Sequence, residues 1–284
     1  MDFSVLYDKE LEIFSIGYDA EEQKLSNSYY DLLASEARQT SFIAIAKGDV
    51  PQKHWFKLGR TLTLIDGSSS LLSWSGTMFE YLMPLLIMRN YEYTLLDETY
   101  KSVIKAQMIY GEQRRVPWGV SESAFYAFDM QFNYQYKAFG VPMLGMKRGL
   151  INDIVISPYS TLMALSVAPH YAVKNIDVLI EEGLNGKYGM YEAIDYTPTR
   201  LPHKKKSMIV KSFMVHHLGM SLMALDNFLN DNIMQTRFHA SPMVKATELL
   251  LQERMPQREV YIKDYEIENL ARVSEKQMRD IRAV

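Results

Sequence analysis

Long segments with apolar residues at helical spacing dominate this chain, and they constrain its fold more than any other feature. The spacing predicts helices over 27–47, 77–88, 96–114, 158–168, 174–182, 207–229, 242–254 and 275–283. One β element is expected, a hairpin over 60–74 that turns at Asp66-Gly67. Roughly eight helices with one small β element predict an all-α array of helical hairpins rather than an α/β sheet.

Composition limits the classes of function. The chain has 31 Lys and Arg against 34 Asp and Glu, and this net charge of −3 argues against a broad nucleic-acid-binding surface. The absence of Cys excludes disulfides, thiolate metal sites and a Cys nucleophile. No apolar run has the length of a membrane span, and the acidic N-terminus lacks a signal-peptide pattern. A soluble protein is therefore expected. Its start at 2–7 carries no capping signal and suggests an excised domain.

Several catalytic and cofactor motifs are missing. There is no phosphate-binding G-x-x-x-x-G-K-[ST], no G-x-S-x-G and no H-E-x-x-H. His216 and His217 are adjacent, so on a helix they point about 100° apart and do not make a metal pair by themselves. We expect these two histidines to be structural or to contact substrate, and we expect no metal ion and no cofactor.

Two carboxylates are the first catalytic candidates. Glu36 falls on the apolar stripe of the predicted 27–47 helix, where burial raises a carboxyl pKa and suits a general acid. A position at the edge of the stripe, or pairing with an Arg, is the alternative. Glu122 follows Ser121, a plausible N-cap, and a helix start favours the ionised form that a nucleophile or base needs. Ordinary enrichment of Glu in a first helical turn is the alternative there.

Three further carboxylates are ambiguous. Glu80 follows Thr77 with capping-box spacing, which favours a structural role over chemistry. Glu192 and Asp195 lie three residues apart and can share one helix face. Substrate hydroxyls or Arg200 are equally good partners for them.

Aromatic residues gather in a segment without clear periodicity, 118–152. Seven of the fifteen residues from Phe125 to Phe139 are aromatic, and the segment is expected to be irregular. Together with Trp74 and Trp118 they can form a trough for the apolar faces of sugars. For most of the seven, a hydrophobic cluster under a long loop is the favoured interpretation.

Six motifs of this chain resemble one known family. They are Y-D-L-L-A-S-E-A-R at 30–38, A-K-G-D-V-P-Q-K-H-W-F-K-L-G-R at 46–60, L-S-W-S-G-T-M-F-E-Y-L-M-P at 72–84, P-W-G-V-S-E-S-A at 117–124, Y-G-M-Y-E-A-I-D at 188–195 and H-H-L-G-M at 216–220. The chain is similar, over about 6–230, to the glycoamylase-like domain of cyclic β-1,2-glucan synthases.

The resemblance implies an architecture. It implies an (α/α)6 toroid, incomplete at the N-terminus because the family's domain begins with helices that precede Asp2. Residues 1–284 would form a single glycoamylase-like domain with a core over 6–255 and a C-terminal tail or linker over 256–284. This domain would be cytoplasmic, as part of a larger membrane-associated protein. The parent protein would also contain covalently linked glycosyltransferase and phosphorylase-like domains.

The resemblance also implies an activity. Characterised relatives cyclise linear β-1,2-glucan by retaining transglycosylation, and matching motifs make Glu36 the acid/base and Glu122 the nucleophile. An inverting β-1,2-glucan hydrolase and a non-catalytic glucan-binding module are the alternatives. Substrate contacts are expected at Arg38, Trp74, Glu80, Trp118, Tyr188, Tyr191, Glu192 and His216.

Overall fold

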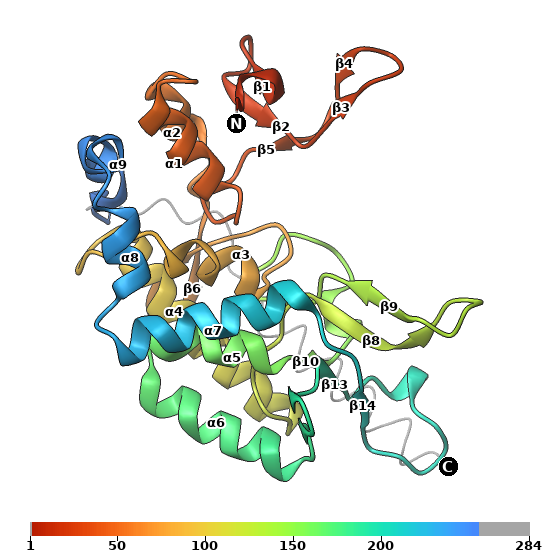
Figure 1. The fold of residues 1–284 in the computed structure, drawn as a ribbon. Helices are drawn as coiled ribbons and strands as arrows, with labels where there is room; N and C mark the ends of the chain where they lie inside the picture. Colours follow the sequence, from red (N-terminus) through yellow and green to blue (C-terminus); the bar gives the residue numbers. More distant parts are fainter. Residues whose placement is uncertain (1, 256–284) are drawn as a thin grey trace.

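The computed structural model describes residues 2–255. Figure 1 shows small N-terminal strands on one side of a helical body, with a β-hairpin projecting from that body on the side facing them. The helices are α1 (Arg38–Lys47), α2 (Lys53–Lys57), α3 (Met78–Leu82), α4 (Leu95–Arg114), α5 (Pro158–Met163), α6 (Pro169–Glu181), α7 (Val215–Leu229), α8 (Ile233–Phe238) and α9 (Pro242–Thr247).

The strands are short and pair antiparallel in six small sheets within the described residues. They are β1 (Tyr7–Asp8), β2 (Ile13–Ser15), β3 (Tyr18–Asp19), β4 (Lys24–Leu25), β5 (Tyr29–Tyr30), β6 (Leu62–Ile65), β7 (Ser68–Leu71), β8 (Ser123–Phe128), β9 (Tyr134–Lys137), β10 (Val155–Ile156), β11 (Asn185–Gly186), β12 (Gly189–Met190), β13 (Ala193–Asp195) and β14 (Met208–Val210). Two sheets have three strands, in the orders β1-β2-β5 and β10-β13-β14.

Helix α4 is the central element of the core. Its N-cap Thr94 accepts a hydrogen bond from the Asp97 amide, and its buried face includes Tyr100, Val103 and Tyr110. The β6–β7 hairpin packs against α4, while α5 packs against both α6 and α7. One continuous cluster of buried side chains joins these elements, so the helical body folds around a single main core.

Two sequence predictions are confirmed. The helix expected over 96–114 is α4, and the hairpin expected over 60–74 is β6–β7. Asp66 and Gly67 form its turn with φ values of 46° and 79°, the left-handed backbone that a tight two-residue hairpin requires.

The helix predicted over 27–47 is wrong in its first half. Helix α1 begins only at Arg38, and the chain before it forms β5 and then pairs with Gly59. The Leu33 amide donates to the Gly59 carbonyl at 3.0 Å, and the Gly59 amide donates to the Asp31 carbonyl at 2.6 Å. These long-range hydrogen bonds use the backbone groups that a helix would need, so tertiary pairing overrides the local pattern.

The expectation of one small β element is also wrong. The segment 118–152, expected to be irregular, contains the β8–β9 hairpin, and the helix predicted over 207–229 begins at Val215 because 208–210 pairs with β13. More of the described residues lie in helices than in strands, and the short sheets are inserted between the helices. No helix within residues 2–255 is long and apolar enough to cross a membrane. The helix predicted over 275–283 lies outside the described residues.

Candidate active site

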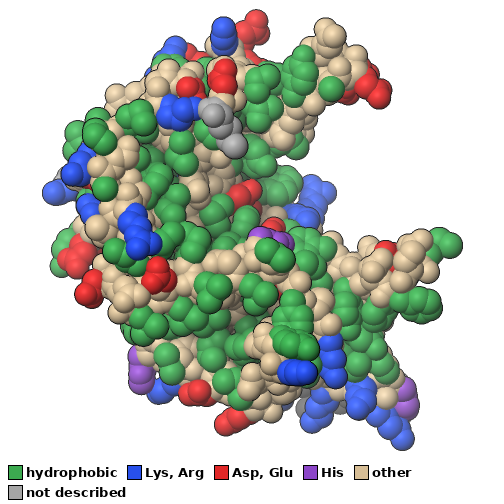
Figure 2. Space-filling model, viewed as in Figure 1, with side chains coloured by type: hydrophobic (Ala, Val, Ile, Leu, Met, Phe, Trp, Pro, Cys, Tyr) green, Lys and Arg blue, Asp and Glu red, His purple; other side chains and the backbone are tan. Residues whose placement is uncertain are grey.

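A deep hollow separates the N-terminal strands from the β8–β9 hairpin, and acidic and histidine side chains lie at its inner end (Figure 2). It contains a cavity of about 480 Å³. Glu36 and Glu122 both line this cavity, together with Tyr29, Tyr30, Trp74 and Glu80. The structure therefore brings the two sequence-predicted catalytic carboxylates to one site.

Glu36 lies in the turn before α1 rather than on a helical stripe. The Ser35 hydroxyl donates to Glu36 Oε2 at 3.2 Å. Beneath this turn, the Arg38 guanidinium donates to the carbonyls of Ser35 at 2.9 Å and Glu80 at 2.8 Å. Arg38 is 1% exposed, so the substrate contact expected for it is wrong. It instead ties the Glu36 turn to α3.

Glu80 has the structural role that its capping-box spacing predicts. Its carboxylate accepts from the Ser73 hydroxyl at 2.8 Å and from the Ser75 and Thr77 amides at 2.9 Å each, while Thr77 accepts from the Glu80 amide at 3.1 Å. Burial raises the pKa of Glu80, and these hydrogen bonds oppose that effect. Both carboxylate oxygens are thus engaged within the protein, although the side chain borders the cavity.

Glu122 precedes strand β8, so the predicted helix start is wrong. Ser121 does not cap a helix here: its hydroxyl bonds to the Tyr159 hydroxyl at 2.8 Å and accepts from the Phe79 amide at 3.1 Å. Glu122 therefore does not lie in the first turn of a helix of its own. Burial instead raises the pKa of this carboxyl, and a 2.9 Å hydrogen bond from the Tyr136 hydroxyl opposes the shift.

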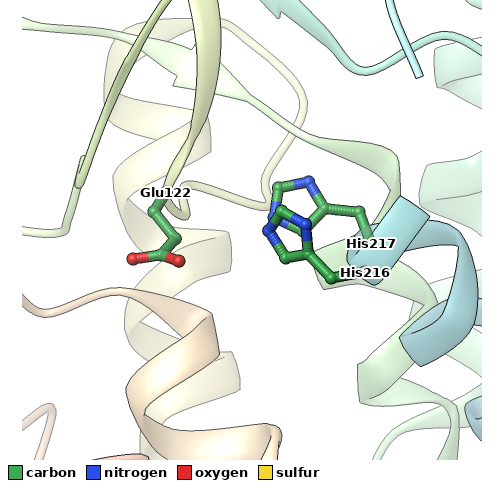
Figure 3. Close-up of side chains that lie close together, drawn as sticks. All are labelled: Glu122, His216 and His217. Atoms are coloured by element: carbon green, nitrogen blue, oxygen red, sulfur yellow. The ribbon is translucent and has the colours of Figure 1, made fainter. Parts of the chain in front are cut away.

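His216 and His217 converge beside Glu122 although they are neighbours in sequence. Figure 3 shows both rings, from the first turn of α7, on one side of the Glu122 side chain. Their ring centroids are 4.1 Å apart, and their Nε2 atoms lie 3.4 and 3.2 Å from the Tyr136 hydroxyl. One side-chain atom each of Glu122, His216 and His217 lies within 4.8 Å of the other two, and the Tyr136 hydroxyl is within hydrogen-bond distance of all three side chains.

Glu192 and Asp195 do not share a helix face. Glu192 is 5% exposed and holds His217, whose Nδ1 lies 2.8 Å from Glu192 Oε1. Asp195 pairs with Arg200 at 2.8 Å, one of the two partners expected from the sequence. The substrate contact predicted for Glu192 is wrong because its carboxylate is occupied inside the protein.

The predicted aromatic contacts divide into two groups. Trp74 is 59% exposed and lines the cavity, but Trp118 is buried, with its backbone held by Asn175. Tyr188 and Tyr191 pack near Phe213 and do not line the cavity that contains Glu36 and Glu122. The substrate contact expected for Trp118 is therefore wrong, whereas contacts of Tyr188 and Tyr191 with a substrate outside this cavity stay predictions.

His217, expected to be structural or to contact substrate, bonds to Glu192, whereas the roles of Tyr136 and Tyr159 were not predicted from the sequence. The alternation of Phe132, Tyr134 and Tyr136 is the period-2 pattern of a strand, and it could have predicted that Tyr134 and Tyr136 share one face. Nothing local could have predicted that this face lies beside α7, because that depends on tertiary packing.

Comparisons with known proteins show the family of this chain. A family model described as Glycoamylase, "Putative glucoamylase", matches residues 28–242. The chain is 46% identical over 256 residues to the cyclic beta-(1,2)-glucan synthase NdvB of Rhizobium meliloti (strain 1021). This matched segment covers 90% of the chain. The chain spans only 9% of that relative's length. These matches confirm the resemblance seen in the sequence motifs.

Solved structures share the fold. The endo-beta-1,2-glucanase of Chitinophaga pinensis superposes on 88% of this chain and 61% of its own, with a TM-score of 0.65 and 16% identity. The beta-1,2-glucanase of Parabacteroides distasonis covers 88% of this chain and 39% of its own, with a TM-score of 0.64 and 16% identity. At such identities the likeness establishes a common fold.

Proposed function

Because the chain belongs to the Glycoamylase family, we propose that its cavity acts on β-1,2-glucan and closes linear chains into rings by retaining transglycosylation. The observation that carries the proposal is that Glu36 and Glu122, from segments far apart in sequence, line one cavity. Paired carboxylates on the two sides of a glycosidic bond are the machinery of most glycoside-active enzymes.

Each carboxylate has one role in this proposal. Glu36 donates a proton to the departing glycosidic oxygen while Glu122 attacks the anomeric carbon and forms a glycosyl ester. A hydroxyl at the other end of the same glucan then attacks that carbon, gives its proton to Glu36 and releases the Glu122 carboxylate. No atom or proton is gained or lost over the two steps.

The surroundings of Glu36 suit a long substrate. A second hollow of about 410 Å³ shares Ile16, Tyr30 and Glu36 with the first, and aromatic and aliphatic side chains line much of it. A glucan chain can therefore extend to both sides of Glu36. The exposed Trp74 offers a ring on which a sugar can pack.

Hydrolysis is the second candidate, because two solved structures of the same fold are named β-1,2-glucanases. In an inverting hydrolase, one carboxyl protonates the leaving oxygen while a water that has given its proton to the other carboxylate attacks the anomeric carbon directly, so no glycosyl ester forms. Anomer-resolved NMR of the first product separates the mechanisms, since inversion produces the opposite anomer.

The test is incubation of the chain, and of its parent protein, with linear β-1,2-glucan. Mass spectrometry should reveal products one water lighter than linear chains of the same length. Glu36→Gln and Glu122→Gln should each abolish them, because each removes one ionisable carboxyl. Turnover that survives both substitutions contradicts the assignment. Binding without conversion by the parent protein favours a non-catalytic glucan-binding module.

The proposal extends to the architecture and the parent protein. We infer that the helices form part of an (α/α)6 toroid, supported by the fold shared with solved structures of which this chain spans 61% and 39%. The 9% coverage of the synthase supports a place within a longer protein, and we propose that this protein is cytoplasmic and membrane-associated and carries glycosyltransferase and phosphorylase-like domains. A structure of the parent protein tests both inferences.

A further inference from the structure

A hydrogen-bonded chain runs from the interior to the Glu122 carboxylate. Nδ1 of His217 lies 2.8 and 3.0 Å from the two Glu192 carboxylate oxygens, and its Nε2 lies 3.2 Å from the Tyr136 hydroxyl. That hydroxyl is in turn 2.9 Å from Glu122 Oε1. His217 and Glu192 are only 2% and 5% exposed, so the inner links are shielded from water.

The neighbouring elements hold this chain in place. The Ala124 amide of β8 donates to Glu192 Oε1 at 3.2 Å. Tyr159 of α5 stacks on the His217 ring, with centroids 3.7 Å apart and planes 10° apart, and donates from its hydroxyl to the Glu122 carbonyl at 2.9 Å. Helix α5 thus fixes both the imidazole of His217 and the backbone of Glu122.

The geometry restricts where the protons lie. Because Nδ1 of His217 faces a carboxylate, that nitrogen carries a proton, and Nε2 accepts when the ring is neutral or donates when it is charged. Two arrangements hold the same number of protons. In one, Glu122 is protonated and His217 is neutral. In the other, Glu122 is a carboxylate, His217 is an imidazolium, and the Tyr136 hydroxyl has reversed its hydrogen bonds.

The inference that follows rests on the proposed function. We propose that Glu192, His217 and Tyr136 are positioning residues that form a proton relay and convert Glu122 into the attacking carboxylate. The proton of Glu122 passes to the Tyr136 oxygen as the Tyr136 proton passes to Nε2 of His217. Glu192 balances the imidazolium charge. The relay returns the proton after the glycosyl ester opens.

Other titratable groups around Glu122 affect where the protons lie. Burial and the nearby carboxylate of Glu36 raise the pKa of Glu122 and therefore oppose its ionisation. Burial and the adjacent His217 lower the pKa of His216, which keeps that ring neutral. Desolvation and the Glu122 carboxylate raise the pKa of Tyr136, which therefore keeps its proton as a donor.

Tyr136→Phe is the first test because it removes one hydroxyl from a side chain that is 42% exposed and leaves the ring in place. Loss of a hydrogen bond to a charged group predicts a fall in kcat of about 10- to 100-fold with little change in KM. The acidic limb of the pH–rate profile should move upward by about one pH unit, since Glu122 then lacks a donor to its ionised form.

Glu192→Gln is the second variant. Its amide oxygen can still accept from Nδ1 of His217, so the fold is kept while the charge that balances the imidazolium is lost. The same fall in kcat and the same shift of the acidic limb are expected. Tyr171→Phe, an equal substitution at a 53% exposed position of α6, should leave both unchanged.

NMR of ¹⁵N-labelled histidine gives a readout that needs no turnover. The relay predicts that Tyr136→Phe and Glu122→Gln alter the protonation of Nε2 of His217, whereas Tyr171→Phe does not. Wild-type turnover with unchanged kinetics and spectra in Tyr136→Phe and Glu192→Gln overturns the relay and leaves the proposed function standing. An inactive parent protein overturns the proposed function. The spectra still show whether Tyr136 and Glu122 alter the protonation of Nε2 of His217, so the relay is tested independently.

Discussion

At the scale of single residues, the protonation of Glu122 governs the proposed chemistry. Burial raises its pKa, and only its ionised form can attack the anomeric carbon. Activity should therefore fall as the pH drops through a value above the ordinary pKa of a glutamate. The wild-type pH dependence of kcat/KM on β-1,2-glucan measures this limb. If this acidic limb gives a pKa at or below the ordinary value for glutamate, the Glu122 carboxyl is not desolvated in the active protein.

At the scale of elements, the capping box fixes the wall of the cavity. Glu80→Ala leaves the Ser75 and Thr77 amides at the start of α3 without acceptors, and these groups are buried. The expected loss is about 2 kcal/mol of unfolding free energy. Chemical denaturation measures it, with Glu98→Ala in the first turn of α4 as the matched control that should change stability by less than about 0.5 kcal/mol. Equal effects of the two substitutions would contradict this role.

At the scale of the whole molecule, the end of the described chain is tied to two distant segments, one before strand β6 and one at the start of helix α4. Arg60 Nε donates to both oxygens of Glu253 at 2.7 and 2.9 Å, and the Leu95 amide donates to the Glu253 carbonyl at 2.7 Å. Glu253→Ala removes the side-chain pair and keeps the backbone bond, so it should lower the unfolding free energy by about 1 kcal/mol and reduce Tm. The exposed Glu22, paired with Lys24, serves as the control, and Glu22→Ala should have almost no effect. If both variants melt alike, the Arg60–Glu253 pair does not stabilise the attachment of this segment.

The sequence by itself determined features that depend on neighbouring residues. Helix α4, the Asp66-Gly67 turn and the capping box of Glu80 follow from local spacing, because each is stabilised by contacts within a few residues. The family motifs likewise indicated Glu36 and Glu122. Their surroundings were predicted wrongly, since neither carboxylate lies on a helix.

Tertiary structure decided the rest. Pairing with Gly59 and with β13 took backbone hydrogen bonds away from two predicted helices, and local propensity cannot anticipate partners so distant in sequence. The same packing set Tyr136 of β9 beside His217 of α7 and buried Glu192 behind them. The sequence thus indicated the two carboxylates that line the cavity. Only the folded chain decided which groups form hydrogen bonds near them, because a hydrogen bond requires atoms to lie within about 3 Å of one another.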